Sequence, residues 1–69
     1  MKLLDVVALL DDEPARGLSR GQVGTIVELL APQVFEVEFC DLEGRALALL
    51  ALPQDRLMVL HHKSAVAAT

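Results

Sequence analysis

The sequence predicts a small all-β domain, and three observations lead to that prediction. Residues 17–39 read as a glycine-punctuated turn, a strand, a short loop and a second strand. Within residues 34–39, apolar and acidic side chains alternate from Phe35 to Phe39, which is the period of a half-buried strand. The other apolar runs are short, and segments rich in Gly, Pro and Asp separate them. With 69 residues, the chain can form one domain around one core.

The first predicted strand lies within Leu3–Leu10, where Val6 and Val7 favour extended structure. The leucines of this run leave a helical turn open, but its length favours a strand. Residues 11–17 read DDEPARG, and their carboxylates, proline and glycine predict a long polar loop. Gly21 and Gly24 follow, and each is expected to supply a backbone conformation or a close approach that a side chain would prevent.

The second and third strands are expected at Thr25–Leu30 and Val34–Phe39. In the third strand, Phe35, Val37 and Phe39 share one face and the two glutamates share the other. This alternation predicts one buried face and one face in water. The segment 41–44, which reads DLEG, predicts a turn that joins the third and fourth strands in a hairpin.

The fourth predicted strand, Arg45–Leu52, reads RALALLAL and has no polar face. A strand that is apolar on both sides is normally covered on both sides, whereas a small barrel covers only one. We therefore expect the outward residues Leu47, Leu49 and Ala51 to meet another copy of the chain or another protein. A helix is the alternative, because Ala and Leu are good helix formers, but Gly44 and Pro53 leave it little room.

The last predicted elements are a single 3₁₀ turn at 53–56 and a short strand at Leu57–Leu60. These boundaries give a domain at residues 1–62 and a flexible C-terminal tail at residues 63–69, in which 65–68 could extend a short helix.

The composition is apolar and acidic. Hydrophobic residues make up 54% of the chain, although only two of them are aromatic, and ten acidic residues against six basic ones give a net charge of −4. So much apolar content in so small a domain predicts apolar surface that a partner covers. The basic residues are scattered singly, which disfavours nucleic-acid binding.

The expected environment is the cytoplasm. Charged residues interrupt every apolar run before it reaches the ~20 residues of a membrane span, and Asp5 makes the first run a poor signal peptide. One cysteine, Cys40, excludes an internal disulfide and suits a reducing compartment.

Candidates for catalysis and metal binding are few. Cys40 lies beside Glu38 and Asp41, whose negative charges oppose formation of a thiolate, so a packing role is favoured. His61 and His62 are adjacent, and on an extended strand they point to opposite faces, which prevents them from chelating one ion together. The carboxylates at 11–13 lack the spacing of a calcium loop. We expect no enzyme activity, no metal and no cofactor.

Five short strands, a long first loop and a 3₁₀ turn before the last strand together resemble the SH3-like barrel. The segment RGQVGTIVE at 20–28 also resembles the short glycine-containing motif of the KOW type, found in ribosomal and transcription-elongation proteins. The chain as a whole resembles a family of small bacterial proteins known only as a domain of unknown function, through LLDVVALL, RGQVGTIVELL, VFEVEFCDLEGR and LPQDRLMVLHH. This resemblance covers residues 1–62 and implies a fold and a bacterial origin, with no activity attached.

The sequence therefore leaves two functions open. The first is a non-enzymatic protein-interaction module that self-associates or binds another bacterial protein, as an accessory or antitoxin-like partner, through Leu47, Leu49 and Ala51. The carboxylates of Asp11, Asp12 and Glu13 would suit a basic partner surface. The alternative is an RNA- or ribosome-associated domain that contacts nucleic acid through Arg16, Arg20 and Gln22.

Overall fold

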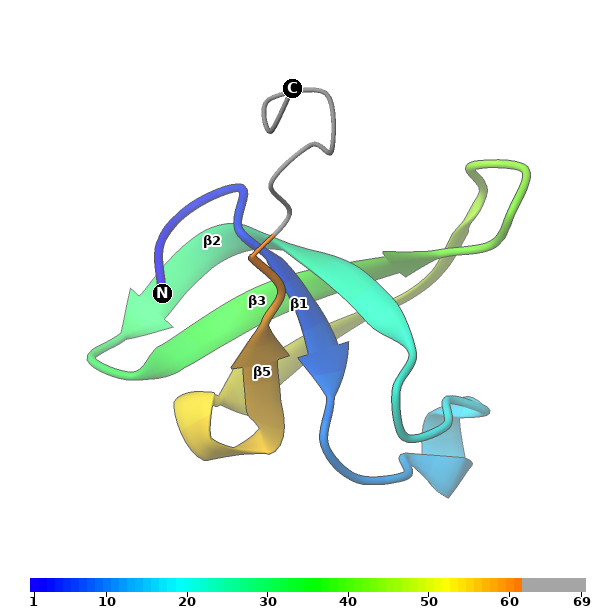
Figure 1. The fold of residues 1–69 in the computed structure, drawn as a ribbon, viewed down its shortest axis with the longest axis horizontal. Coiled ribbons are helices and arrows are strands. Elements are labelled where there is room, and N and C mark those ends of the chain that lie inside the picture. Colours follow the sequence, from blue (N-terminus) through cyan, green and yellow to red (C-terminus); the bar gives the residue numbers. More distant parts are fainter. Residues whose placement is uncertain (62–69) are drawn as a thin grey trace, which may run out of the picture.

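A computed structural model describes residues 1–61 of the protein and contains one antiparallel sheet with the strand order β4-β3-β2-β1-β5 (Figure 1). The prediction of an all-β fold is confirmed, as is the 3₁₀ turn before the last strand. The predicted tail at 63–69 lies outside the described residues. The elements are β1 (Val6–Leu9), the 3₁₀ turn η1 (Pro14–Arg16), β2 (Val23–Ala31), β3 (Val34–Cys40), β4 (Ala46–Pro53), the 3₁₀ turn η2 (Gln54–Arg56) and β5 (Leu57–Val59).

Strand β2 holds the sheet together because it pairs with β1 through its first residues and with β3 over most of its length. It curves strongly between these two neighbours (Figure 1). The β2–β3 register shifts between Ile26 and Glu28 and again between Leu29 and Ala31. Such bulges increase the bend and twist of a strand, which allows a single sheet to wrap around a core.

The core lies on the inner face of this sheet. Phe35, Val37 and Phe39 of β3 are buried, while Glu36 and Glu38 are only half-buried on the other face. The predicted alternation of β3 is therefore confirmed. The other strands complete the core with Val7, Leu9, Ile26, Leu50, Leu52 and Leu57.

Gly24 marks a close approach between β2 and β3. A Cβ atom at this position would lie 2.8 Å from Cδ1 of Phe39, 2.8 Å from Cγ1 of Val37 and 2.9 Å from the carbonyl oxygen of Glu38. Gly21 has a φ of 88°, which side chains rarely adopt. The two glycines thus serve the two purposes expected of them.

The loop after β1 is more ordered than its polar sequence predicts. Pro14–Arg16 form η1, and the backbones of Glu13 and Leu18 exchange two hydrogen bonds of 2.8 and 3.1 Å. Leu18 is buried in the core, so this loop also covers part of it. The proline and the left-handed Gly17 that follows favour such a single turn.

Strand β4 is extended, which rules out the helical alternative for Ala46–Leu52. It pairs with β3 in a hairpin, as predicted, and its other side has no hydrogen-bonded neighbour in the described sheet. β4 and the short strand β5 are therefore the two edges. Among residues 1–61, no helix has the length and apolar character that crossing a membrane requires.

Candidate functional site

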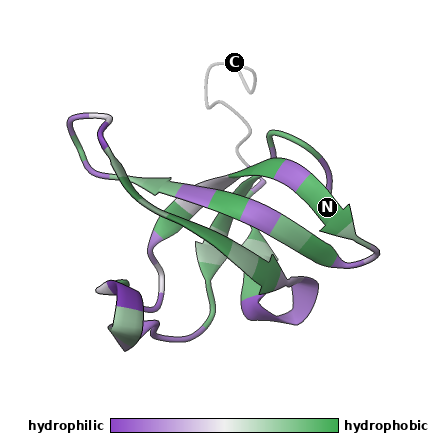
Figure 2. Cartoon of the chain, turned by 180° about the vertical axis from the view of Figure 1, so that it is seen from behind, coloured by the Kyte–Doolittle hydropathy of each residue, from purple (hydrophilic) through white to green (hydrophobic). Residues whose placement is uncertain are grey.

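The outward side chains of β4 form an exposed apolar row, and β2 also leaves Leu29 and Leu30 about half exposed. Leu47 is 50% exposed, Leu49 is 55% exposed and Ala51 is also exposed, and we call these three residues the β4 outer row. Leu50 and Leu52, on the opposite face, are buried in the core. Figure 2 shows β4 as hydrophobic along its length, whereas the neighbouring β3 alternates with hydrophilic residues.

An acidic strip lies next to the β4 outer row. The strand register places Glu38 opposite Leu49 and Glu36 opposite Ala51. On its other side, Glu36 lies opposite Glu28 of β2. We call Glu28, Glu36 and Glu38 the acidic strip. None of the five strands that the structure describes carries Lys or Arg, so no strand residue compensates these carboxylates.

The bulge in β2 brings Glu28 into this strip. Ile26 is fully buried, and simple alternation would turn Glu28 to the same inner face. The extra residue Val27 between the paired positions instead places Glu28 beside Glu36 on the outer face. Sequence reasoning missed Glu28, because alternation alone does not reveal where a bulge will form.

A second exposed apolar group lies toward the other edge of the sheet. Ala8 of β1 pairs with Val23 of β2 and with Met58 of β5. Val23 and Met58 are each about half exposed, and Ala8 between them is buried. This group spans three different strands.

The predicted acidic residues 11–13 are engaged within the chain. The guanidinium group of Arg56 donates a hydrogen bond of 2.5 Å to Glu13 and lies 3.6 Å from the carboxylate of Asp11. Asp12 accepts a hydrogen bond of 2.8 Å from the backbone N–H of Arg20. These carboxylates tie the first loop to η2, and in the described residues no hydrogen bond or ion pair joins them to the β4 outer row.

The Glu13 hydrogen bond raises the pKa of Arg56 above its ordinary value, despite an opposing effect of desolvation. Arg56 was not expected to matter from the sequence, in which it is one of several scattered basic residues. Its partners lie more than forty positions earlier in the chain. Only the pairing of β1 with β5 reveals that they meet.

The candidate nucleic-acid residues all lie in the first loop. Arg16 ends η1 and is exposed. The side-chain oxygen of Gln22 accepts a hydrogen bond of 3.2 Å from the backbone N–H of Ser19, which closes the turn before β2. Arg20 and Arg16 share this loop with the acidic residues 11–13, so the loop offers no purely basic surface.

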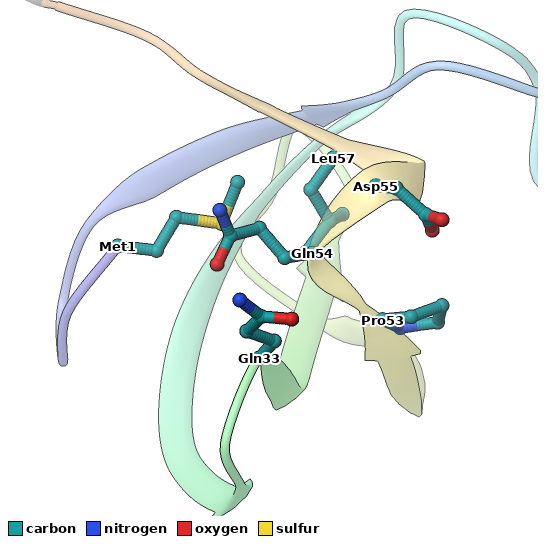
Figure 3. Close-up of a pocket in the computed structure, with 6 residues that line it drawn as sticks. All are labelled: Met1, Gln33, Pro53, Gln54, Asp55 and Leu57. Carbon is teal, nitrogen blue, oxygen red and sulfur yellow. The ribbon is translucent and has the colours of Figure 1, made fainter.

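A pocket of about 300 Å³ lies where η2 meets the β2–β3 turn (Figure 3). Its lining consists of Met1, Gln33, Pro53, Gln54, Asp55 and Leu57. Gln33 adopts a φ of 64°, and its backbone oxygen accepts a 2.8 Å hydrogen bond from the N–H of Gln54. The carboxylate of Asp55 points away from the two side-chain amides (Figure 3). This lining contains one carboxylate and no Ser, Thr, Cys, Lys or His side chain, so it holds no pair of nucleophile and base.

The remaining candidate residues are isolated from one another. Cys40 is exposed at the end of β3, and His61 is exposed after β5. His62 lies outside the described residues. Within residues 1–61, no three His, Cys, Asp or Glu side chains come together as a set of metal ligands.

Together, the fold and its surface define a small all-β domain with an exposed apolar edge strand. The chain belongs to the family described as "Domain of unknown function (DUF4926)", which matches residues 3–59. Searches of curated proteins and of solved structures found no match.

Proposed function

We propose that this protein is a non-enzymatic, self-associating interaction module of the bacterial cytoplasm, built as an SH3-like barrel. Five short strands, a long first loop and a 3₁₀ turn before the last strand support the fold assignment. The observation that carries the function is the β4 outer row, which leaves two leucines about half exposed on an edge strand. Exposed apolar residues that follow one another along a strand are typical of an interface.

Self-association is favoured over capture of a basic partner. The carboxylates of residues 11–13, which would recognise such a partner, bind Arg56 and the backbone of Arg20 instead. The β4 outer row itself is uncharged, so its burial requires no charged ligand.

The same contacts weaken the RNA alternative. Gln22 uses its side chain within the turn, and acidic residues share the loop with Arg16 and Arg20. RNA association is accordingly the second candidate function, and a test of RNA binding separates it from self-association.

Solution mass, measured by light scattering over a hundredfold range of protein concentration, tests the proposal. We expect a dimer or a larger assembly that dissociates on dilution. Leu49→Lys should shift this equilibrium to monomer, because each copy would then bring a lysine to the contact in place of an apolar side chain, and like charges repel. Leu42→Lys is the matched control, since Leu42 is a fully exposed leucine at the tip of the β3–β4 hairpin. A wild-type protein that stays monomeric throughout would contradict self-association.

A further inference from the structure

From the edge position of β4 and its hydrogen-bonding register, we infer that two copies of the chain pair antiparallel along this strand. A two-fold axis then passes beside Leu50, and one ten-stranded sheet results. The inference rests on the proposed self-association and specifies its geometry. Strand β4 spans eight residues, ends the sheet and contains no charged residue. Natural edge strands are usually shortened, charged or covered, because their free N–H and C=O groups bind other strands.

The register of β3 and β4 identifies which backbone groups of β4 point outward. The N–H of Gln54 donates to the oxygen of Gln33 at 2.8 Å, directly beyond the Val34–Pro53 pair. In antiparallel sheets, hydrogen-bonded pairs alternate with pairs that are not bonded to each other. The bond from Gln54 to Gln33 shows that the Val34–Pro53 pair is one of the pairs that are not bonded to each other. The Phe35–Leu52 and Val37–Leu50 pairs are therefore hydrogen-bonded, so Leu50 and Leu52 bond to β3.

Leu49 and Ala51 consequently direct their N–H and C=O groups to the open side of β4. They are also members of the β4 outer row, so the same two residues offer both free backbone groups and exposed side chains. The backbone of Pro53 also faces the open side of β4, because Pro53 lies two residues after Ala51. Proline has no N–H, so this end of the edge offers no hydrogen-bond donor.

The ends of β4 fix the register of the proposed pair. A two-fold axis beside Leu50 places Leu49 of each copy opposite Ala51 of the other, as hydrogen-bonded pairs. The same register places Pro53 of one copy opposite Leu47 of the other. Pro53 has no N–H, and Leu47 is the extra residue where the β3–β4 register shifts. The two irregular residues, Pro53 and Leu47, therefore lie opposite each other at both ends of the shared ladder. The regular residues between them pair along their whole length.

The acidic strip argues against the other symmetric arrangement, in which two sheets stack face to face. Stacking would bring Glu28, Glu36 and Glu38 of both copies together with no strand Lys or Arg to compensate. Like charges in close contact are unfavourable. Edge pairing keeps the two strips apart and joins only uncharged residues.

Amide hydrogen exchange on the wild-type protein tests the pairing without a substitution. The amides of Leu49 and Ala51 should exchange at least about tenfold more slowly at concentrations where the assembly forms than after dilution to monomer. The amides of Leu50 and Leu52, which bond to β3 in either state, should change much less. An assembly in which Leu49 and Ala51 exchange as fast as in the monomer would overturn the inference.

A proline separates backbone pairing from side-chain packing. Ala51→Pro removes only an N–H that points away from β3, a position at which edge strands tolerate proline. We expect it to weaken association at least about tenfold, because it removes donors from both hydrogen-bonded pairs. Ala51→Val, which keeps the N–H, should still associate. Circular dichroism establishes that both variants fold.

Cross-linking determines the register, and it decides the matter if Ala51→Pro does not fold. In a Cys40→Ser background, Leu49→Cys and Ala51→Cys chains should form an intermolecular disulfide on mild oxidation mainly when the two variants are mixed, because only directly opposite residues come close enough. Preferential cross-linking of either variant with itself would place the two-fold axis elsewhere and overturn the register.

The outcomes distinguish this inference from the proposed function. A wild-type protein that is monomeric at every concentration contradicts both. An assembly that Leu49→Lys disrupts and Ala51→Pro leaves intact supports self-association but overturns edge pairing.

Discussion

At the residue scale, Gly24 is a position where the fold leaves no room for a side chain. An added Cβ would overlap the buried side chains of Phe39 and Val37 and the backbone of Glu38, at 2.8 to 2.9 Å. None of these atoms is the end of a flexible surface chain, so the core must move. We predict that Gly24→Ala lowers the free energy of unfolding by about 1–3 kcal/mol, as overpacked cores do.

Urea denaturation at a fixed protein concentration measures this effect. Thr25→Ala is the control, because Thr25 is the next residue of β2 and is half-exposed on the other face. A Gly24→Ala protein within about 0.5 kcal/mol of wild type would show that β2 and β3 separate easily at this point.

Asp41 gives the stability of the β3–β4 turn a dependence on pH. Its Oδ1 accepts hydrogen bonds from the backbone N–H groups of Glu43 at 2.8 Å and Arg45 at 2.9 Å, and its Oδ2 accepts one from Nε of Arg45 at 3.1 Å. The bond from the Arg45 N–H is the largest cause that lowers the pKa of Asp41 below its ordinary value. Hydrogen bonds from Lys2 lower the pKa of Asp5 in the same way.

A lowered pKa in the folded state means that the unfolded chain binds the proton more readily. The contribution of Asp41 is therefore complete above the ordinary pKa of the carboxyl group and is lost as the pH falls through the lower, folded pKa. We predict that the wild type loses more stability than Asp41→Asn between pH 7 and pH 3 in urea titrations. Asp5→Asn serves as a comparison at a site far from the turn. Equal losses in the wild type and Asp41→Asn would contradict the role of this carboxylate.

At the scale of elements, Arg56 joins η2 to the loop that follows β1. Its contacts with Glu13 and Asp11 hold this loop where Leu18 enters the core. We predict that Arg56→Gln makes the loop open more often, so that trypsin cuts after Arg16 and Arg20 roughly three- to tenfold faster.

Arg45→Gln is the matched control for this experiment, because Arg45 also makes two ion pairs but makes them within the β3–β4 turn. Time-resolved mass spectrometry identifies the cleavage sites. Unchanged cutting at Arg16 and Arg20 in Arg56→Gln would mean that backbone hydrogen bonds alone hold the loop.

The strands could be predicted from the sequence because each depends on a local pattern. The alternation in β3 separates its two faces, and the glycines and prolines between the apolar runs mark where the strands end. The contacts of Arg56 and the position of Glu28 could not be predicted in this way. The first depends on residues that are far apart in the chain, and the second depends on a bulge whose position is decided by packing across β2 and β3.

Only part of the candidate surface could be predicted from the sequence. The absence of a polar face in β4 indicated outward residues at Leu47, Leu49 and Ala51, and the structure places all three on the exposed face. The strand order, which makes β4 an edge, arises from pairing between distant segments. Asp11, Asp12 and Glu13 were expected to suit a basic partner surface, which stays a prediction, whereas their contacts within the chain depend on segments that the sequence pattern does not bring together.

At the scale of the whole molecule, charge governs which polymers the protein attracts. The net charge is −4, and every strand of the described sheet lacks Lys and Arg. Because phosphate contacts supply most of the affinity of nucleic-acid binding, we predict no binding of single-stranded or duplex RNA at low salt in fluorescence anisotropy titrations. Salt-dependent binding that disappears in Arg16→Ala/Arg20→Ala would contradict this prediction and favour the RNA alternative.

If two copies pair as we propose, the short strand at the far end of the sheet would limit how large the assembly grows. β5 contains only three residues, and the N–H of Leu57 at its start is already bonded to the oxygen of Gln54. When two copies use their β4 edges on each other, the ends of the combined sheet are two such short strands, which offer little backbone for a third copy. A two-fold contact of this kind is closed, so the pair does not propagate into a fibre. For the proposed pair, one long edge and one short edge in each copy therefore predict a dimer instead of a polymer.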